Sequence, residues 1–167
     1  IKKGHEIYAT VRFSSNLWRI ADITSEIEII KLNNSSIAEF KNLFNRIKPD
    51  VVINAMGAVS RAVIGDTTLN WKSNFLSLVE LVNAMEELKN TLLIHAGSSF
   101  EYGKASKVKN PVSEENRCEP VSEYGISKLF CTKYLEYYAN KSSNIFYDFR
   151  VFNLYGPFES SDRLITD

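Results

Sequence analysis

Val51-Val52-Ile53-Asn54-Ala55-Met56-Gly57 is the stretch of sequence that decides the fold. It is short, almost entirely apolar, and ends at a glycine. Uniform apolar runs are typical of parallel strands buried on both faces, whereas a half-exposed strand alternates apolar and polar residues. The stretch therefore predicts a buried strand of a parallel sheet.

Strand and helix patterns alternate on both sides of this stretch. Strands are expected at 6–12, 27–32, 51–57, 91–96 and 145–152, and helices from 33–36 through Ile47, at 71–88 and at 124–141. Such alternation predicts a doubly wound parallel sheet with helices on both faces, a three-layer α/β/α architecture. Ligands of such sheets bind beyond the carboxyl ends of the strands, so the residues that follow each strand are the informative ones.

The composition limits the kinds of partner. The chain has 167 residues with 20 basic and 20 acidic side chains, which predicts one globular domain without net charge. This balance gives no basic surface for nucleic acid, and no apolar run approaches the roughly 18 residues of a membrane helix. The two cysteines form neither a disulfide framework nor a metal-binding pattern. We therefore expect a reduced, cytoplasmic setting, with no nucleic acid, membrane or metal as partner.

Tyr124 and Lys128 form a Y-x-x-x-K pattern on one face of an expected helix. An ammonium group near a phenol favours the phenolate, which lowers the pKa of the phenol, and it can also hold a ribose hydroxyl. The spacing recurs at Tyr137 and Lys141, so two exposed helix pairs are the alternative interpretation.

Position in the chain distinguishes the two patterns. Tyr124 begins its helix directly after a loop, so its side chain can face the carboxyl edge of the sheet. Ser98 follows the buried strand 91–96 and is expected at the same edge. A serine hydroxyl beside an acid–base tyrosine can orient a substrate carbonyl or alcohol for hydride transfer.

Five segments occur in the order and with the spacing of one known family. They are 51–57, Asn74, Gly97-Ser98-Ser99-Phe100-Glu101-Tyr102-Gly103, Tyr124 to Lys128, and Phe149-Arg150-Val151-Phe152-Asn153-Leu154-Tyr155-Gly156-Pro157. On these segments the chain resembles the extended short-chain dehydrogenase/reductase family, which comprises nucleotide-sugar epimerases, dehydratases and reductases. The resemblance covers essentially the whole chain.

The resemblance implies roles for individual residues. Ser98, Tyr124 and Lys128 match the family's catalytic residues. The positions that match its cofactor site are Ala55, Met56, Gly57, Asn74, Tyr124, Lys128 and Phe152, and those that match its substrate site are Ser98, Ser99, Asn153 and Arg163. The implied ligands are a nicotinamide dinucleotide and a nucleotide sugar. Family members often dimerise through two long helices, which correspond here to 71–88 and 124–141.

Two features that the resemblance leads us to expect are not found in the sequence: the N-terminal strand with its glycine-rich turn, and the smaller C-terminal substrate domain, which would follow Asp167. The family opens with a strand and a G-x-x-G-x-x-G turn that holds the cofactor pyrophosphate, and the seven glycines here contain no such run. Ile1 to Gly4 resembles the last turn of the next helix, so about 20–25 residues are expected to be missing before it. We therefore expect a Rossmann-like domain over 1–157, incomplete at both ends, with 158–167 as the start of the substrate-binding segment.

The cofactor preference is inferred from the end of the first strand. NAD-preferring members of the family place an acidic residue there, whereas Val11 and Arg12 stand here, followed by Ser14. A guanidinium and a hydroxyl suit a 2′-phosphate, so NADP is expected in preference to NAD. The alternative is that Arg12 is only a solvated strand end. Leu32, at the end of the next strand, is expected to contact the adenine through its main chain.

Residues 99 and 100 bear on the class of reaction. The family's sugar dehydratases carry an acid and a base just after the catalytic Ser or Thr, and Ser99 and Phe100 stand there in this chain. Glu101 comes one residue later and, on a strand-like segment, is expected to point the other way. An epimerase or a 4-keto reductase is therefore expected. A dehydratase that uses Glu101 and a catalytically idle dinucleotide-sensing module remain as alternatives.

Overall fold

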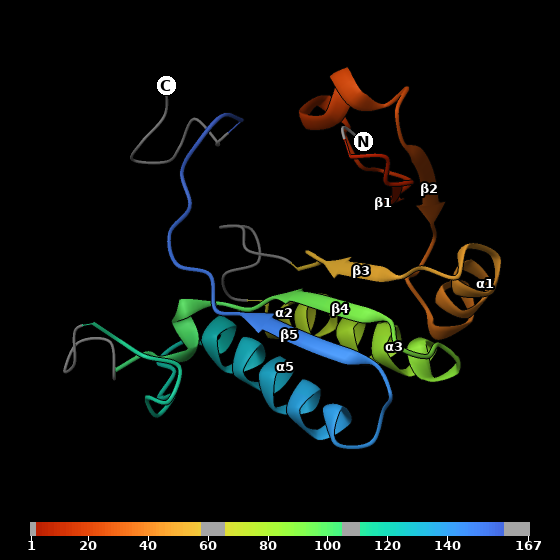
Figure 1. Ribbon diagram of the computed structural model, residues 1–167. Coiled ribbons are helices and arrows are strands. Elements are labelled where there is room, and N and C mark those ends of the chain that lie inside the picture. The colour runs from red at the N-terminus through yellow and green to blue at the C-terminus, as the bar shows by residue number, and fades with distance from the viewer. Residues whose placement is uncertain (1–2, 58–65, 105–110, 159–167) are drawn as a thin grey trace. The chain divides into compact units, whose positions relative to one another are not determined.

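The computed structural model describes residues 3–57, 66–104 and 111–158 (Figure 1). The strands are β1 (Tyr8–Arg12), β2 (Glu28–Leu32), β3 (Val51–Asn54), β4 (Leu92–Ala96) and β5 (Ile145–Phe149). The α-helices are α1 (Ile37–Ile47), α2 (Thr67–Trp71), α3 (Ser77–Ala84) and α5 (Glu123–Ala139). Shorter helical segments are η1 (Trp18–Ile23), η2 (Lys72–Leu76), η3 (Met85–Glu87) and η4 (Ser99–Glu101). No helix within these ranges has the length and apolar character needed to cross a membrane.

The chain divides into two compact units. The first comprises 1–35 and 154–167, and the second comprises 36–153. In the first unit β1 and β2 pair in parallel, with Arg12 opposite Leu32. In the second unit β3, β4 and β5 form a parallel sheet in that order. The parallel strands that alternate with helices confirm the predicted Rossmann-like α/β class, but among the described residues they pair as two separate ladders.

One face of the sheet in the second unit carries the helices. Helices α2, α3 and α5 lie on this face (Figure 1), and the β4 side chains of Leu93 and His95 beneath them have no exposed surface. On the opposite face, Ile53 and Tyr147 are 72% and 55% exposed. Helix α1 packs against α3, where Glu80 accepts a hydrogen bond of 2.6 Å from the Ile37 N–H. The described residues of this unit therefore supply one helical layer, and the expected second layer is not formed by them.

The core of the second unit lies between this sheet face and the helices. Its buried apolar side chains are Phe40, Leu43, Phe44, Leu78, Leu81, Val82, Met85, Leu93, Cys131 and Leu135. Trp71 and Phe130 meet edge to face with ring centroids 5.1 Å apart, which joins α2 to α5. Packing of this kind fixes α5 against the sheet, and α5 carries Tyr124 and Lys128.

The helix expected over 71–88 starts earlier and is not uniform. Asp66 caps α2 by accepting a hydrogen bond of 2.9 Å from the Leu69 N–H, so the helical run begins at Thr67. Residues 72–76 then form a π-helical turn, and 85–87 form a 3-10 turn. An apolar stripe predicts a helix but does not distinguish its hydrogen-bond spacing, so these turns were not predicted.

Two expected strands end sooner than the sequence suggested. The strand expected at 51–57 ends at Asn54, whose side-chain Oδ1 accepts a hydrogen bond of 3.0 Å from the Met56 N–H. The strand expected at 145–152 ends at Phe149. Polar side chains that bond to nearby main chain compete with the ladder, and this competition is difficult to read from apolar runs.

Candidate active site

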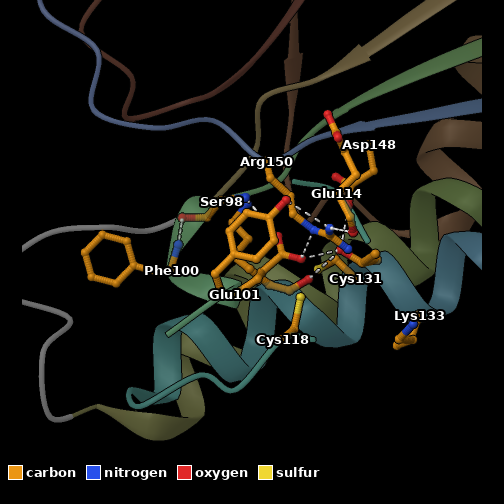
Figure 2. Close-up of polar contacts among 12 residues, drawn as sticks. Ser98, Phe100, Glu101, Glu114, Cys118, Cys131, Lys133, Asp148 and Arg150 are labelled. Atoms are coloured by element: carbon orange, nitrogen blue, oxygen red, sulfur yellow. Dashed lines mark hydrogen bonds and ion pairs between the residues drawn. The ribbon is translucent and has the colours of Figure 1, made fainter. Parts of the chain in front are cut away.

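Ser98 follows β4 and caps the short η4 turn. Its hydroxyl accepts a hydrogen bond of 3.3 Å from the Phe100 N–H, and its own N–H donates to Glu101 Oε1 at 2.9 Å (Figure 2). Ser98 is 5% exposed. The reciprocal cap fixes both the main chain and the side chain of this residue.

Tyr124 lies in the first turn of α5, as expected. Ser122 caps the helix by accepting a hydrogen bond of 3.1 Å from the Gly125 N–H. The Tyr124 ring is half-buried and meets the Phe100 ring edge to face at 5.7 Å. Burial raises the pKa of Tyr124, and a hydrogen bond with the Ser98 side chain opposes this increase. The structure thus places Tyr124 beside the turn that Ser98 caps.

Lys128 lies one turn further along α5 and is 4% exposed. Its Nζ donates a hydrogen bond of 2.8 Å to the main-chain oxygen of Ala96, at the end of β4. Burial lowers the pKa of Lys128. The decrease in the pKa of Tyr124 that the Tyr–Lys spacing led us to expect is not found, because burial of the phenol has the largest effect there.

Gly57 and Asn74 lie beside Lys128. A Cβ added at Gly57 would be 2.8 Å from Asn74 Oδ1 and 3.7 Å from Lys128 Nζ. Asn74 is 1% exposed, and its Nδ2 donates to Asn70 Oδ1 and, at 3.4 Å, to Ser127 Oγ. The missing side chain at Gly57 therefore allows the main chain after β3 to lie close to Asn74, near the buried amine of Lys128. This segment stands at the carboxyl end of β3, where dinucleotides bind in sheets of this class.

Other predicted site residues of the second unit lie at the same ends of strands. Ala55 is exposed and Met56 half-buried, directly after β3. The Ser99 N–H donates a hydrogen bond of 3.0 Å to the main-chain oxygen of Val151. This bond joins the turn that follows Ser98 to the segment that follows β5.

Phe152 and Asn153 belong to that segment. The Phe152 ring is 57% exposed and stacks on Tyr102, with ring centroids 6.2 Å apart. Asn153 is exposed. Arg163 lies outside the described residues, as does the rest of the expected substrate segment after Phe158.

Three predicted cofactor residues lie in the first unit. Arg12 and Leu32 are opposite each other at the carboxyl ends of β1 and β2, and Ser14 follows in an exposed turn. The Ser15 N–H closes this turn by donating to the Arg12 main-chain oxygen at 3.0 Å, and Ser15 Oγ accepts from the Arg12 N–H at 3.1 Å. An exposed guanidinium and hydroxyl on a closed turn are suited to an anionic group.

Sequence reasoning considered Glu101 only as an alternative acid or base, and it missed the three residues that group with Glu101 behind Ser98. Glu101 is fully buried and forms an ion pair of 3.1 Å with Arg150, and Thr132 contacts both Glu101 and Asp148. One signal was available, because Thr132 lies one turn after Lys128 on the same helix face. No local pattern joins these residues to Asp148 or Arg150, which reach the site only through the fold.

Comparisons with known proteins agree with this architecture. The UDP-glucose 4-epimerase of Thermotoga maritima, solved with UDP-glucose, is 21% identical, with a TM-score of 0.81 over 93% of this chain and 50% of that one. The UDP-glucose 4-epimerase of Thermus thermophilus, solved with NAD, is 19% identical, with a TM-score of 0.81 over 95% of this chain and 51% of that one. Pal from Bacillus thuringiensis is 18% identical, with a TM-score of 0.84 over 96% and 52%.

The chain spans about half the length of these solved structures, and at this identity the likeness concerns the fold. The sequence itself, over residues 1–167, matches a single family description. On that match, the chain belongs to the NAD dependent epimerase/dehydratase family.

Proposed function

We propose that the protein containing this chain is an NAD(P)-dependent epimerase or 4-keto reductase that acts on a nucleotide-activated sugar. The observation that carries the proposal is the grouping of Ser98, Tyr124 and Lys128 at the carboxyl edge of a parallel sheet. Tyr124 packs on Phe100, two residues after Ser98, and Lys128 bonds to the main chain at the end of β4. Family membership supports nicotinamide chemistry. Two of the similar structures are UDP-glucose 4-epimerases, which supports a nucleotide sugar as substrate.

Each residue of this trio has a distinct task. Tyr124 takes the proton of a sugar hydroxyl, or returns one to a ketone, and Ser98 holds the reacting oxygen through its hydroxyl. Lys128 holds a ribose hydroxyl of the cofactor through its ammonium group. The bound nicotinamide supplies the acceptor or donor of hydride. The other proposed contacts of the nicotinamide half of the cofactor are Gly57, Asn74, Ala55, Met56 and Phe152.

The substrate side of the site is formed by the segments that follow β4 and β5. Ser99, Asn153 and Arg163 are proposed to contact the nucleotide sugar. The bond between the Ser99 N–H and the Val151 oxygen supports this grouping, because it joins the two segments directly.

The cofactor is proposed to be NADP in preference to NAD. Arg12 and Ser14 are exposed at the end of β1, and Leu32 stands opposite Arg12. Replacing Arg12 with alanine in the full-length protein is expected to weaken NADPH binding roughly ten- to a hundredfold, since a charge-assisted bond to the 2′-phosphate is lost. NADH binding is expected to change little. Equal losses for both cofactors would show that Arg12 does not select NADP.

Dehydration receives less support. The carboxylate of Glu101 has no exposed surface and is engaged by the Ser98 N–H and by Arg150, so it is not free to act as a base. The nearest ring to Tyr124 on this turn is Phe100, which cannot transfer a proton.

A homodimer is proposed through the helical segments 71–88 and 124–141. Leu76, in η2, and Phe130, in α5, are each 50% exposed, and Phe130 belongs to an aromatic cluster with Trp71 and Phe75. Half-exposed apolar side chains on two adjacent helices are typical of an interface between protein chains.

The reaction can be assigned by following the sugar and the cofactor together in the full-length protein. For a 4-keto reductase, each product molecule consumes one reduced nicotinamide. For an epimerase, the sugar inverts while the total of reduced nicotinamide stays constant. Neither outcome with any nucleotide sugar, despite measured cofactor binding, would support the idle dinucleotide-sensing module instead.

A further inference from the structure

Two acidic side chains meet at one hydroxyl behind Ser98. Thr132 Oγ1 lies 2.6 Å from Glu101 Oε2 and 2.5 Å from Asp148 Oδ2. Figure 2 shows Glu101, Asp148 and Arg150 in one cluster near Ser98. The three elements involved are η4, α5 and β5, so the contact exists only in the folded chain.

Counting protons sets a condition on this contact. A threonine hydroxyl has one proton and can donate it to only one of the two carboxylates. The other oxygen at 2.5–2.6 Å must then be a donor, because two bare acceptors do not approach so closely. One of the two carboxyl groups therefore carries a proton when the site is formed as observed. The Thr132 hydroxyl has one other possible acceptor, the Lys128 main-chain oxygen, but this oxygen is 3.5 Å away, farther than either carboxylate oxygen.

The surroundings identify the carboxyl group that holds this proton. Glu101 accepts the Ser98 N–H at 2.9 Å and pairs with Arg150 Nε at 3.1 Å, and both contacts favour its ionised form. Asp148 Oδ1 is buried and has no hydrogen-bond partner within the described part of the chain. A buried oxygen without a donor disfavours a charge, so the proton belongs to Asp148.

The groups that face Asp148 agree with this assignment. The pKa of Asp148 is raised to about 6. Burial has the largest effect and the Glu101 charge acts in the same direction, whereas the hydrogen bond with Thr132 and the charges of Arg150 and Lys128 oppose the increase. The titratable groups around it are Lys128 and Cys131 on α5, Glu101 in η4, Arg150 after β5, and His95, its register partner on β4. Burial holds the pKa of His95 at about 3, so His95 contributes no positive charge.

We propose that Asp148, Thr132 and Glu101 share one proton in a buried relay, and that this relay positions Ser98. Asp148 Oδ2–H donates to Thr132 Oγ1, the Thr132 hydroxyl donates to Glu101 Oε2, and ionised Glu101 accepts the Ser98 N–H. Glu101 and Asp148 are positioning residues, since neither touches the reacting atoms. The importance of Ser98 rests on the proposed function, whereas the relay itself does not.

Loss of the Asp148 proton is expected to alter the hydrogen bond between the Ser98 N–H and Glu101. With both carboxyl groups ionised, the single Thr132 proton serves only one of them, and one of the two short contacts is lost. The proton can exchange with solvent because Thr132, Asp148 and Arg150 also line a surface pocket of about 600 Å³. The main-chain position of Ser98 is therefore expected to depend on pH through Asp148.

The test is an NMR pH titration of the full-length protein, with isotope labels at the aspartate carboxyl carbons and the main-chain nitrogens. The Asp148→Asn variant removes one carboxyl resonance and so assigns it. In the wild type, the Asp148 carboxyl and the Ser98 N–H are expected to move with one shared midpoint, above the ordinary aspartate value of about 3.9. Glu101→Gln removes the neighbouring charge and is expected to lower the midpoint of Asp148.

A matched pair of variants tests the relay. Thr132→Ser keeps the hydroxyl and is expected to keep the shared midpoint. Thr132→Val removes the hydroxyl, so the Ser98 N–H resonance is expected to shift no longer at the midpoint of Asp148. Should Thr132→Val fail to fold, Asp148→Asn decides, because the Ser98 N–H must lose its transition there. An Asp148 midpoint near the ordinary value, or a Ser98 transition that persists in Asp148→Asn, would overturn the proposal.

These readouts need no substrate, so they are separate from the proposed function. Turnover by a Tyr124→Phe variant equal to that of the wild type would reject the catalytic role and leave the relay intact. A Ser98 N–H resonance that does not shift as Asp148 titrates would reject the relay and leave the catalytic role intact.

Discussion

Asp148 gives the stability of the protein a pH dependence of unusual sign. Its pKa is raised from 3.8 to about 6 in the folded state, so the folded chain binds this proton more tightly than the unfolded chain. The contribution is complete below about pH 4 and is lost as the pH rises through about 6. Relative to Asp148→Asn, which cannot titrate, the wild type is expected to lose on the order of 2–3 kcal/mol of unfolding free energy between pH 4 and 7.

Urea unfolding of both proteins across this pH range measures the difference directly. The variant is the necessary control because ordinary carboxylates change stability in the opposite direction over part of the range. A constant difference between the two proteins at every pH would mean that Asp148 titrates alike in the folded and unfolded chains.

Gly103 is required by a close main-chain approach. Its φ is 50°, and an added Cβ would lie 1.9 Å from the main-chain oxygen of Glu119. Gly103→Ala is therefore expected to cost more than about 2 kcal/mol of unfolding free energy. Gly4 is the control, because its φ is 78° but nothing lies within 4 Å of an added Cβ, so Gly4→Ala should cost about 1 kcal/mol at most. Thermal unfolding compares the two, and equal effects would contradict the contact.

Predictability at the level of residues depended on how local the signal was. The grouping of Ser98 with Tyr124 could be anticipated, because each follows a recognisable strand or begins a helix. Glu101 was expected to point the other way from Phe100 on a strand-like segment. Phe100 is exposed and Glu101 is buried, but residues 99–101 form a helical turn instead of a strand. Its partners Thr132 and Arg150 are distant in sequence, and no pattern along the chain links them.

Helix α1 shows how a short sequence signal fixes an element. Ser36 Oγ accepts the Glu39 N–H at 3.4 Å, and the Glu39 carboxylate accepts the Ser36 N–H at 3.3 Å, which makes a capping box. Ser36→Ala is expected to lower the unfolding free energy by about 1 kcal/mol, whereas Ser36→Thr keeps the acceptor and should lower it much less. Chemical denaturation distinguishes them, and equal losses would mean that the cap does not stabilise α1.

The sequence predicted which segments are helices and which are strands better than it predicted where each helix or strand begins and ends. Ser36 and the end at Ile47 gave α1 correctly, since caps are local. The π turn at 72–76 and the early end of β3 at Asn54 were not predicted, because both depend on hydrogen bonds that an apolar pattern does not specify.

The proposed dimer can be tested on the whole molecule. Phe130 is 50% exposed on α5 although it is aromatic, and it contacts Trp71 and Phe75 on its buried side. Phe130→Arg is expected to convert a dimer of the full-length protein to monomer, because a charge would be buried in an apolar interface. Phe130→Leu should remain dimeric. Sedimentation velocity gives the mass, and an unchanged mass for Phe130→Arg would place any interface elsewhere.

The whole architecture was predictable in class but not in pairing. Alternation of strands and helices predicted parallel strands, and each described strand pair is parallel. The sequence contains no signal for which strands are neighbours, because a short strand carries no pattern that specifies its partner. The division into a β1–β2 ladder and a β3–β4–β5 sheet therefore emerged only from the structure.

The most direct test of the central claim is the turnover of nucleotide sugars by the full-length protein and its Tyr124→Phe variant, with NADPH binding measured alongside. The phenylalanine keeps the ring that packs on Phe100 and removes only the phenol hydroxyl. The proposal predicts that turnover falls by about 10²–10⁴ while cofactor binding is retained, because the proton donor and acceptor is lost. Equal turnover in the two proteins would contradict a catalytic role for this site.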